Sequence, residues 1–164
     1  MIDYRALIGA LCASKVRFVI VGGVAATLHG SARLTQHVDI VYSRDADNLR
    51  LISQALGPLQ PYLRGVPPGL PFRLDADTLA TGLNFTLTTS VGDIDLLGEI
   101  AGVGNYDALA HHTVEVELFG FRCLCLDLPT LIQAKVASGR PKDLEAVAEL
   151  RALFEEKPQS RPGA

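Results

Sequence analysis

The sequence predicts an α+β fold in which helices flank a mixed β-sheet and two further helices close the chain. Three observations predict it: helices and strands alternate at first, a run of strands follows, and two helical segments come last. The chain has 164 residues, of which 48% are hydrophobic, so one core of ordinary size can form. We therefore expect a single domain over residues 1–156 and a polar, disordered tail over residues 157–164.

The first third of the chain alternates between helix and strand patterns. Leu7, Ile8 and Leu11 repeat at helical spacing, and a later β-branched run ends at a Gly-Gly pair. The expected elements are a helix over Tyr4–Ala13, a strand over Val16–Val21, a short helix over Val24–His29, a strand over His37–Tyr42 and a helix over Asn48–Leu56.

The rest of the chain begins with a breaker-rich segment. Five prolines and three glycines between Gly57 and Pro71 predict an ordered loop or flap without regular structure. The expected elements after it are strands over Asn84–Thr88, Val91–Gly98, Val114–Leu118 and Phe121–Leu126, then helices over Pro129–Ala137 and Pro141–Phe154.

Composition excludes several classes of protein. The net charge of -3 argues against binding nucleic acid by bulk electrostatics, so any such contact must be local. The longest apolar stretch, Phe18–Leu28, is broken by glycines and is too short to span a membrane. The N-terminus lacks a secretory pattern, which predicts a cytoplasmic location. The three cysteines are expected to be reduced and buried, with a redox or metal pair at Cys123 and Cys125 as the alternative.

Carboxylates interrupt two apolar strands. In an extended strand His37 and Asp39 share one face, and by the same parity Asp93 and Asp95 share one. A carboxylate in such surroundings loses hydration, which a cation or hydrogen bonds must offset. A divalent metal ion would do so. Each pair taken alone is equally compatible with a solvated strand edge.

Glycines and cations near these strands indicate an anion site. Gly22–Gly23 follows a strand and opens a helix, which lets the backbone approach a phosphate closely, although a simple tight turn is the alternative. Lys135, Arg140 and Lys142 surround a helix junction and could clamp a triphosphate or the 3′ end of an acceptor. Their alternative role is to stabilise helix ends. Arg33 is a further candidate phosphate contact.

The order of these features resembles the nucleotidyltransferase fold of the polymerase-β type. A Gly-Gly pair ends one strand, thirteen residues separate it from an acid-x-acid position, and another strand acid comes later. Segments 29–35, 92–98 and 135–144 more narrowly resemble the AbiEii/AbiGii-like nucleotidyltransferase group, many of which are toxins of toxin–antitoxin or phage-defence pairs. The resemblance spans roughly residues 15–150. In that family three acids hold two magnesium ions, and the Gly-Gly turn receives phosphates.

The family pattern transfers to this chain with one departure. Gly22–Gly23 matches the phosphate turn, Asp39 matches the second acid, and Asp95 best matches the third, with Asp93 as its substitute. His37 stands where the family has its first acid. Magnesium prefers oxygen ligands, whereas imidazole suits zinc, manganese or cobalt better. The resemblance therefore implies either reduced activity or a site for one metal ion or a softer one.

The function implied by the resemblance is metal-dependent transfer of a nucleotidyl group from an NTP to an acceptor hydroxyl, with pyrophosphate release and Mg²⁺ or Mn²⁺ as cofactor. The acceptor would be tRNA or another RNA, and a cognate antitoxin would be a further partner. No membrane is expected to be involved. Two alternatives stay open: an impaired nucleotide-binding or antitoxin-binding module, and a transferase acting on a small molecule of the aminoglycoside kind. The implied residues are Asp39, Asp95 and His37 for catalysis, these three and Asp93 for metal, and Gly22, Gly23, Arg33, Lys135 and Lys142 for nucleotide.

Overall fold

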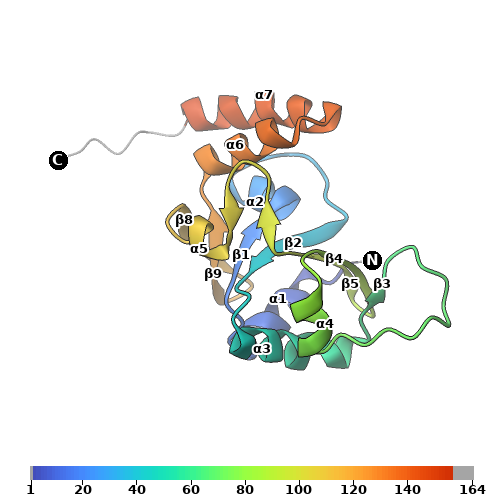
Figure 1. Ribbon diagram of the computed structural model, residues 1–164. Helices are drawn as coiled ribbons and strands as arrows, with labels where there is room; N and C mark the ends of the chain where they lie inside the picture. Colours follow the sequence, from blue (N-terminus) through green and yellow to red (C-terminus); the bar gives the residue numbers. More distant parts are fainter. Residues whose placement is uncertain (1, 157–164) are drawn as a thin grey trace.

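A seven-stranded mixed sheet forms the centre of the computed structural model, which describes residues 2–156 (Figure 1). The strand order is β3-β4-β5-β2-β1-β9-β8. Two neighbouring pairs, β2 with β5 and β1 with β9, run parallel, and the other pairs run antiparallel. The strands are β1 (Phe18–Val21), β2 (His37–Tyr42), β3 (Tyr62–Leu63), β4 (Phe85–Thr89), β5 (Gly92–Leu97), β8 (Thr113–Leu118) and β9 (Phe121–Leu126). The predicted mixed sheet is confirmed.

Helices lie on both sides of this sheet. In Figure 1, α1, α3 and α4 lie below the sheet, and α2, α6 and α7 lie above it. The helices are α1 (Tyr4–Ala13), α2 (Gly22–Leu28), α3 (Ala46–Leu56), α4 (Ala76–Thr81), α5 (Tyr106–Leu109), α6 (Leu128–Ser138) and α7 (Pro141–Glu156). Asp127 caps α6 by accepting a hydrogen bond from the Thr130 amide at 2.9 Å. The predicted C-terminal pair is α6 and α7. The predicted tail lies outside the described residues.

The central strands separate an apolar face from a polar face. Their apolar side chains are fully buried against the helices below, and they are Val38 and Ile40 of β2 and Ile94 and Leu96 of β5. Near the start of both strands, the alternating positions are only partly buried and carry the histidine and the carboxylates. This alternation follows from strand geometry, and it is the parity that the sequence predicts. The polar face is therefore free to form a site.

The prediction that segment 57–71 lacks regular structure is wrong. The segment contains a 3₁₀ turn, η1 (Gly57–Leu59), and the strand β3, which pairs with β4. No proline lies between Pro61 and Pro67, and an edge strand needs hydrogen bonds on one side only. The sequence reading also missed α4, α5 and a two-stranded ribbon of β6 (Glu99–Ile100) and β7 (Gly104–Asn105).

Among the described residues, the three cysteines form no disulfide bond. Cys123 and Cys125 are buried as predicted, whereas Cys12 is partly exposed and its Sγ lies 3.7 Å from that of Cys123. Burial, with smaller contributions from the neighbouring thiols, raises the pKa of Cys123 to about 12. Such a thiol is a poor nucleophile and metal ligand at neutral pH, which disfavours the redox or metal alternative. Among the described residues, no helix has the length and apolar character to cross a membrane.

Candidate functional site

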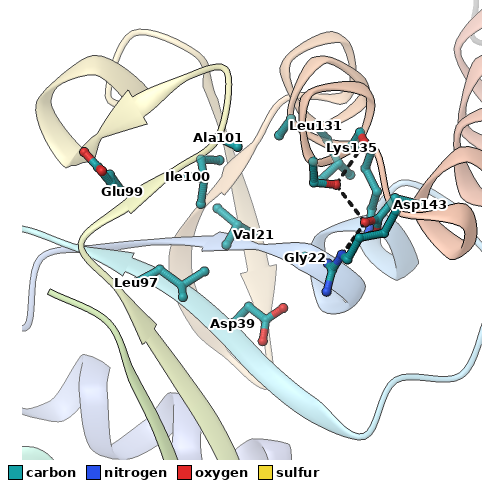
Figure 2. A pocket seen from close by; sticks show the side chains of 13 residues that line it. Val21, Gly22, Asp39, Leu97, Glu99, Ile100, Ala101, Leu131, Lys135 and Asp143 are labelled. Atoms are coloured by element: carbon teal, nitrogen blue, oxygen red, sulfur yellow. Dashed lines mark hydrogen bonds and ion pairs between the residues drawn. The ribbon is translucent and has the colours of Figure 1, made fainter.

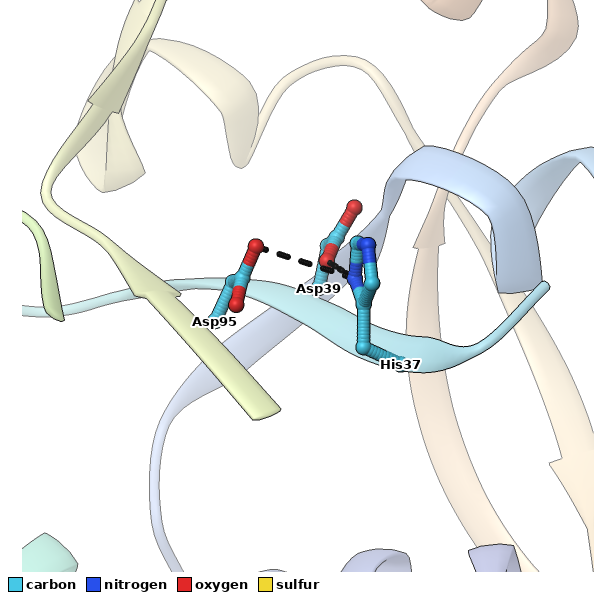
Figure 3. Close-up of side chains that lie close together, drawn as sticks. All are labelled: His37, Asp39 and Asp95. Atoms are coloured by element: carbon cyan, nitrogen blue, oxygen red, sulfur yellow. Dashed lines mark hydrogen bonds and ion pairs between the residues drawn. The ribbon is translucent and has the colours of Figure 1, made fainter. Parts of the chain in front are cut away.

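The polar face brings three predicted site residues together where β2 and β5 begin (Figure 3). Because these strands are parallel and in register, Asp39 lies beside Asp95, and His37 lies beside Asp93. His37, Asp39 and Asp95 each offer one ligand atom, and these atoms lie within 4.8 Å of one another. Residues from two segments that are far apart in the sequence thus form one cluster.

Hydrogen bonding and burial set the electrostatics of this cluster. His37 Nδ1 donates to Asp39 Oδ1 at 2.5 Å and lies 3.6 Å from Asp95 Oδ2. The hydrogen bond with Asp39 is the main cause of a raised pKa for His37, partial burial opposes it, and the charges of both acids add to it. Burial raises the pKa of Asp95, and the Asp39 carboxylate raises it further. Two acids this close favour a cation between them.

The donor set fits a divalent cation that accepts nitrogen. One imidazole nitrogen and two carboxylate oxygens suit Mn²⁺, Zn²⁺ or Co²⁺ better than Mg²⁺, which prefers oxygen alone. Ligation through Nδ1 of His37 would replace its hydrogen bond to Asp39, so proton and metal compete for the same atom. Among the described residues, Asp93 is not part of this cluster, which favours Asp95 as the third acid.

Arg64 is the site residue that the sequence analysis missed. Its terminal nitrogen Nη2 donates to Asp95 Oδ1 at 2.7 Å, and its Nε lies 3.2 Å from Asp93 Oδ2. Arg64 directly follows β3, whose pairing with β4 depends on residues more than twenty positions away. A lone arginine among prolines carries no local signal of that pairing. Only the assembled sheet places it near the acids.

The glycine pair lets two side chains pack against the start of α2. Gly22 has a φ of +64°, and a Cβ there would lie 2.1 Å from Asp39 Oδ2. A Cβ on Gly23 would lie 2.6 Å from Thr35 Oγ1. Both distances are far below any real contact, so each position requires glycine for space. The helix begins at Gly22, two residues before its predicted start, and this places the turn directly beside Asp39.

Cations from the α6–α7 junction are held by one buried acid. Asp143 is 3% exposed, and its carboxylate accepts hydrogen bonds from Ser138 Oγ at 2.7 Å and Arg140 Nε at 2.6 Å. Lys135 Nζ lies 3.7 Å from the other oxygen. Burial alone would raise the pKa of Asp143, but these hydrogen bonds and charges outweigh it and lower the pKa. Asp143 therefore fixes Lys135 and Arg140 beside the cleft.

Two adjoining cavities meet at Asp39. The larger, of about 540 Å³, is polar, and the predicted site residues that line it are Gly23, Arg33, His37, Asp39, Asp95, Lys135 and Lys142. The smaller, of about 260 Å³, has apolar walls from Val21, Leu97, Ile100 and Leu131 (Figure 2). Gly22, Asp39, Lys135 and Asp143 also line it. Arg33 is on the rim of the larger cavity, with Nε 3.8 Å from Glu149 Oε1. Asp93 lines neither cavity.

Comparison with known proteins identifies the fold. No protein-family model and no curated protein sequence matches the chain. Among solved structures it is similar to the lincosamide antibiotic adenylyltransferase LnuA, solved with lincomycin bound, with a TM-score of 0.58, 15% identity, and coverage of 93% of this chain and 98% of that one. It is also similar to a putative nucleotidyltransferase from Thermotoga maritima, with a TM-score of 0.57, 19% identity, and coverage of 96% and 97%.

These similarities establish the class of fold. The chain has the nucleotidyltransferase fold, as its sequence motifs predict. At 15% and 19% identity the likeness extends to the fold and no further. The narrower resemblance to the AbiEii/AbiGii-like group is not confirmed. Function has to be argued from the site.

Proposed function

We propose that the protein is a metal-dependent nucleotidyltransferase that joins the nucleotidyl group of an NTP to an acceptor hydroxyl and releases pyrophosphate. One observation carries the proposal: Asp39 and Asp95 lie side by side with His37 at the mouth of a polar cleft. The fold class supports it, because similar solved proteins are named as nucleotidyltransferases. No other group of His, Cys, Asp and Glu among the described residues offers a comparable ligand set.

The cleft walls suit a triphosphate. Arg33, Lys135 and Lys142 would supply positive charge to the phosphate oxygens, and Asp143 would keep Lys135 in place. Gly23 lines the same wall, with the Thr35 side chain packed against it. The smaller cavity, with its apolar walls, would hold a flat ring such as the nucleobase.

The acids and the histidine have separable roles. His37, Asp39 and Asp95 would hold the divalent cation, which supplies charge neutralisation and orientation of the phosphates when bound. Asp95 lines the larger cavity, so its carboxylate faces the space that an acceptor would enter. Asp95 would therefore take the proton from the acceptor hydroxyl. Asp39 would keep its position through the contact with Gly22.

Two classes of acceptor fit the proposed reaction. An RNA acceptor such as tRNA and a cognate antitoxin follow from the sequence resemblance alone. A hydroxylated small molecule is the other class, because one similar structure is an adenylyltransferase of a lincosamide antibiotic. RNA and hydroxylated small molecules should therefore be tested side by side as acceptors.

A second candidate function is nucleotide binding without transfer. It is favoured by one specific observation: His37 already pairs with Asp39, and Arg64 already pairs with Asp95. The acids are thus partly neutralised by the protein itself, which weakens their pull on a metal ion. In that case the chain would bind nucleotide, or an antitoxin, but would not catalyse transfer.

Radiolabelled transfer separates the two functions. The protein is incubated with each α-labelled NTP, Mn²⁺ or Mg²⁺, and either a tRNA pool or a panel of hydroxylated small molecules. We expect label in one acceptor class, dependence on the divalent cation, and loss in Asp39→Asn and Asp95→Asn. Asp77→Asn, which removes an exposed acid on α4, is the matched control and should keep activity.

The outcomes have distinct meanings. If neither the wild type nor His37→Asp transfers label while calorimetry detects NTP binding, the non-catalytic function is correct. Transfer by His37→Asp alone would identify His37 as an inactivating departure from the family pattern. If no NTP binds, transfer and nucleotide binding are both wrong, and antitoxin binding is the one function left.

A further inference from the structure

Arg64 extends a row of polar residues that crosses β4, β5 and β2. Its amide donates to Thr86 O at 3.0 Å, which extends the β3–β4 ladder by one residue. Thr86 pairs in register with Asp95, and Asp95 with Asp39. Since neighbours in register share a face of a sheet, Arg64 points along the same face as both acids.

The guanidinium is held at several points. Besides Asp95, Nη2 donates to Leu87 O at 2.8 Å and to Ile94 O at 3.3 Å. The side chain is 27% exposed, and the buried Nε faces Asp93 at ion-pair distance without forming a hydrogen bond. Two backbone carbonyls from neighbouring strands therefore fix the group beside its two carboxylates. An exposed surface ion pair has no such anchoring.

The charges on this face favour one divalent cation. Asp39, Asp93 and Asp95 carry three negative charges when ionised, and Arg64 supplies one positive charge among them. Two negative charges remain, which one divalent ion neutralises. A second ion would add excess positive charge within a few ångströms of the guanidinium, where repulsion is strong even at an effective dielectric near 20.

We propose that Arg64 is a built-in cation that takes the place of a second metal ion, so that the site binds a single divalent cation. The inference rests on the proposed function in one respect, because the same cluster of His37, Asp39 and Asp95 would hold that ion. Arg64 acts as a positioning residue: it engages Oδ1 of Asp95 and leaves Oδ2, the oxygen near His37, for the metal.

The number of bound ions is tested by titrating the protein with Mn²⁺ alone. The electron paramagnetic resonance signal measures the Mn²⁺ that stays free. The wild type should bind one ion per chain. Arg64→Gln and Arg64→Met should bind a second ion or bind the first roughly tenfold more tightly, because a repelling charge is gone. Arg64→Lys keeps the charge and should behave like the wild type. Arg73→Gln removes an exposed arginine from the following segment and should have no effect.

The number and affinity of bound Mn²⁺ ions are measured without any assay of nucleotidyl transfer. Two ions in the wild type, or unchanged binding in folded Arg64→Gln and Arg64→Met, would overturn the role of Arg64 alone. No Mn²⁺ binding in any variant would overturn the metal-dependent function as well. Thermal unfolding identifies the folded variants, and if the Arg64 variants do not fold, the stoichiometry of the wild type decides.

Discussion

Replacing His37 with aspartate tests how this side chain sets the charge balance of the cluster with Asp39 and Asp95. In the metal-free protein the change removes the 2.5 Å hydrogen bond to Asp39 and adds a third carboxylate. Each new pair of like charges costs about 3 kcal/mol at roughly 5 Å and an effective dielectric near 20. His37 is 37% exposed, so solvent screens much of this repulsion. We expect His37→Asp to lower the free energy of unfolding by about 2 to 4 kcal/mol at pH 7.5.

A divalent cation should reverse that loss. Urea unfolding followed by circular dichroism gives the free energy of unfolding in EDTA and in Mg²⁺ or Mn²⁺. At a concentration about one hundred times its dissociation constant, a bound ion adds about 2.7 kcal/mol. The gain from Mg²⁺ should be larger in His37→Asp than in the wild type, because three carboxylates suit that ion. Equal stability of both proteins in EDTA, with no gain from either metal, would refute this account of the site.

Three further predictions concern packing and pH. Gly22→Ala should lower the free energy of unfolding by about 2 kcal/mol or more, because the new Cβ would clash with Asp39 and the φ of residue 22 is +64°. Urea unfolding measures this change. Gly57→Ala is the control, because a Cβ at residue 57 would meet no other atom within 4 Å. The pKa of His37 is raised, so the pairing of its protonated ring with Asp39 stabilises the fold fully below about pH 6.5. This stabilisation is lost as the pH rises through the raised pKa. NMR titration should show that rise, and Asp39→Asn should reduce it. The pKa of Asp143 is lowered, so its ionised carboxylate stabilises the fold fully above about pH 4. This stabilisation is lost as the pH falls through the lowered pKa. Acid unfolding should therefore be less steep in Asp143→Asn.

Local sequence patterns predicted the sheet and much of the cluster. The alternation in β2 and β5 placed His37 with Asp39, and Asp93 with Asp95, on one face of each strand, because side-chain direction in a strand depends on parity alone. The pairing of β2 with β5 brings Asp95 rather than Asp93 into the cluster. That choice depends on strand register, which no single segment encodes.

Long-range contacts account for what the sequence did not reveal. Arg64 reaches the acids only because β3 joins the sheet edge, within a segment whose prolines indicated a loop. The pairing of Lys135 with Asp143 depends on the packing of α6 against α7. In both cases a charged group finds its partner through tertiary packing, so residue type and spacing gave no signal.

A crystal structure of the protein with Mn²⁺ and a non-hydrolysable NTP tests most directly whether the cluster of His37, Asp39 and Asp95 binds the cation of a nucleotidyltransferase site. We expect one anomalous peak bounded by these three residues, with the triphosphate along the wall of Lys135 and Lys142. A nucleotide bound elsewhere, or no Mn²⁺ at this cluster, would contradict it.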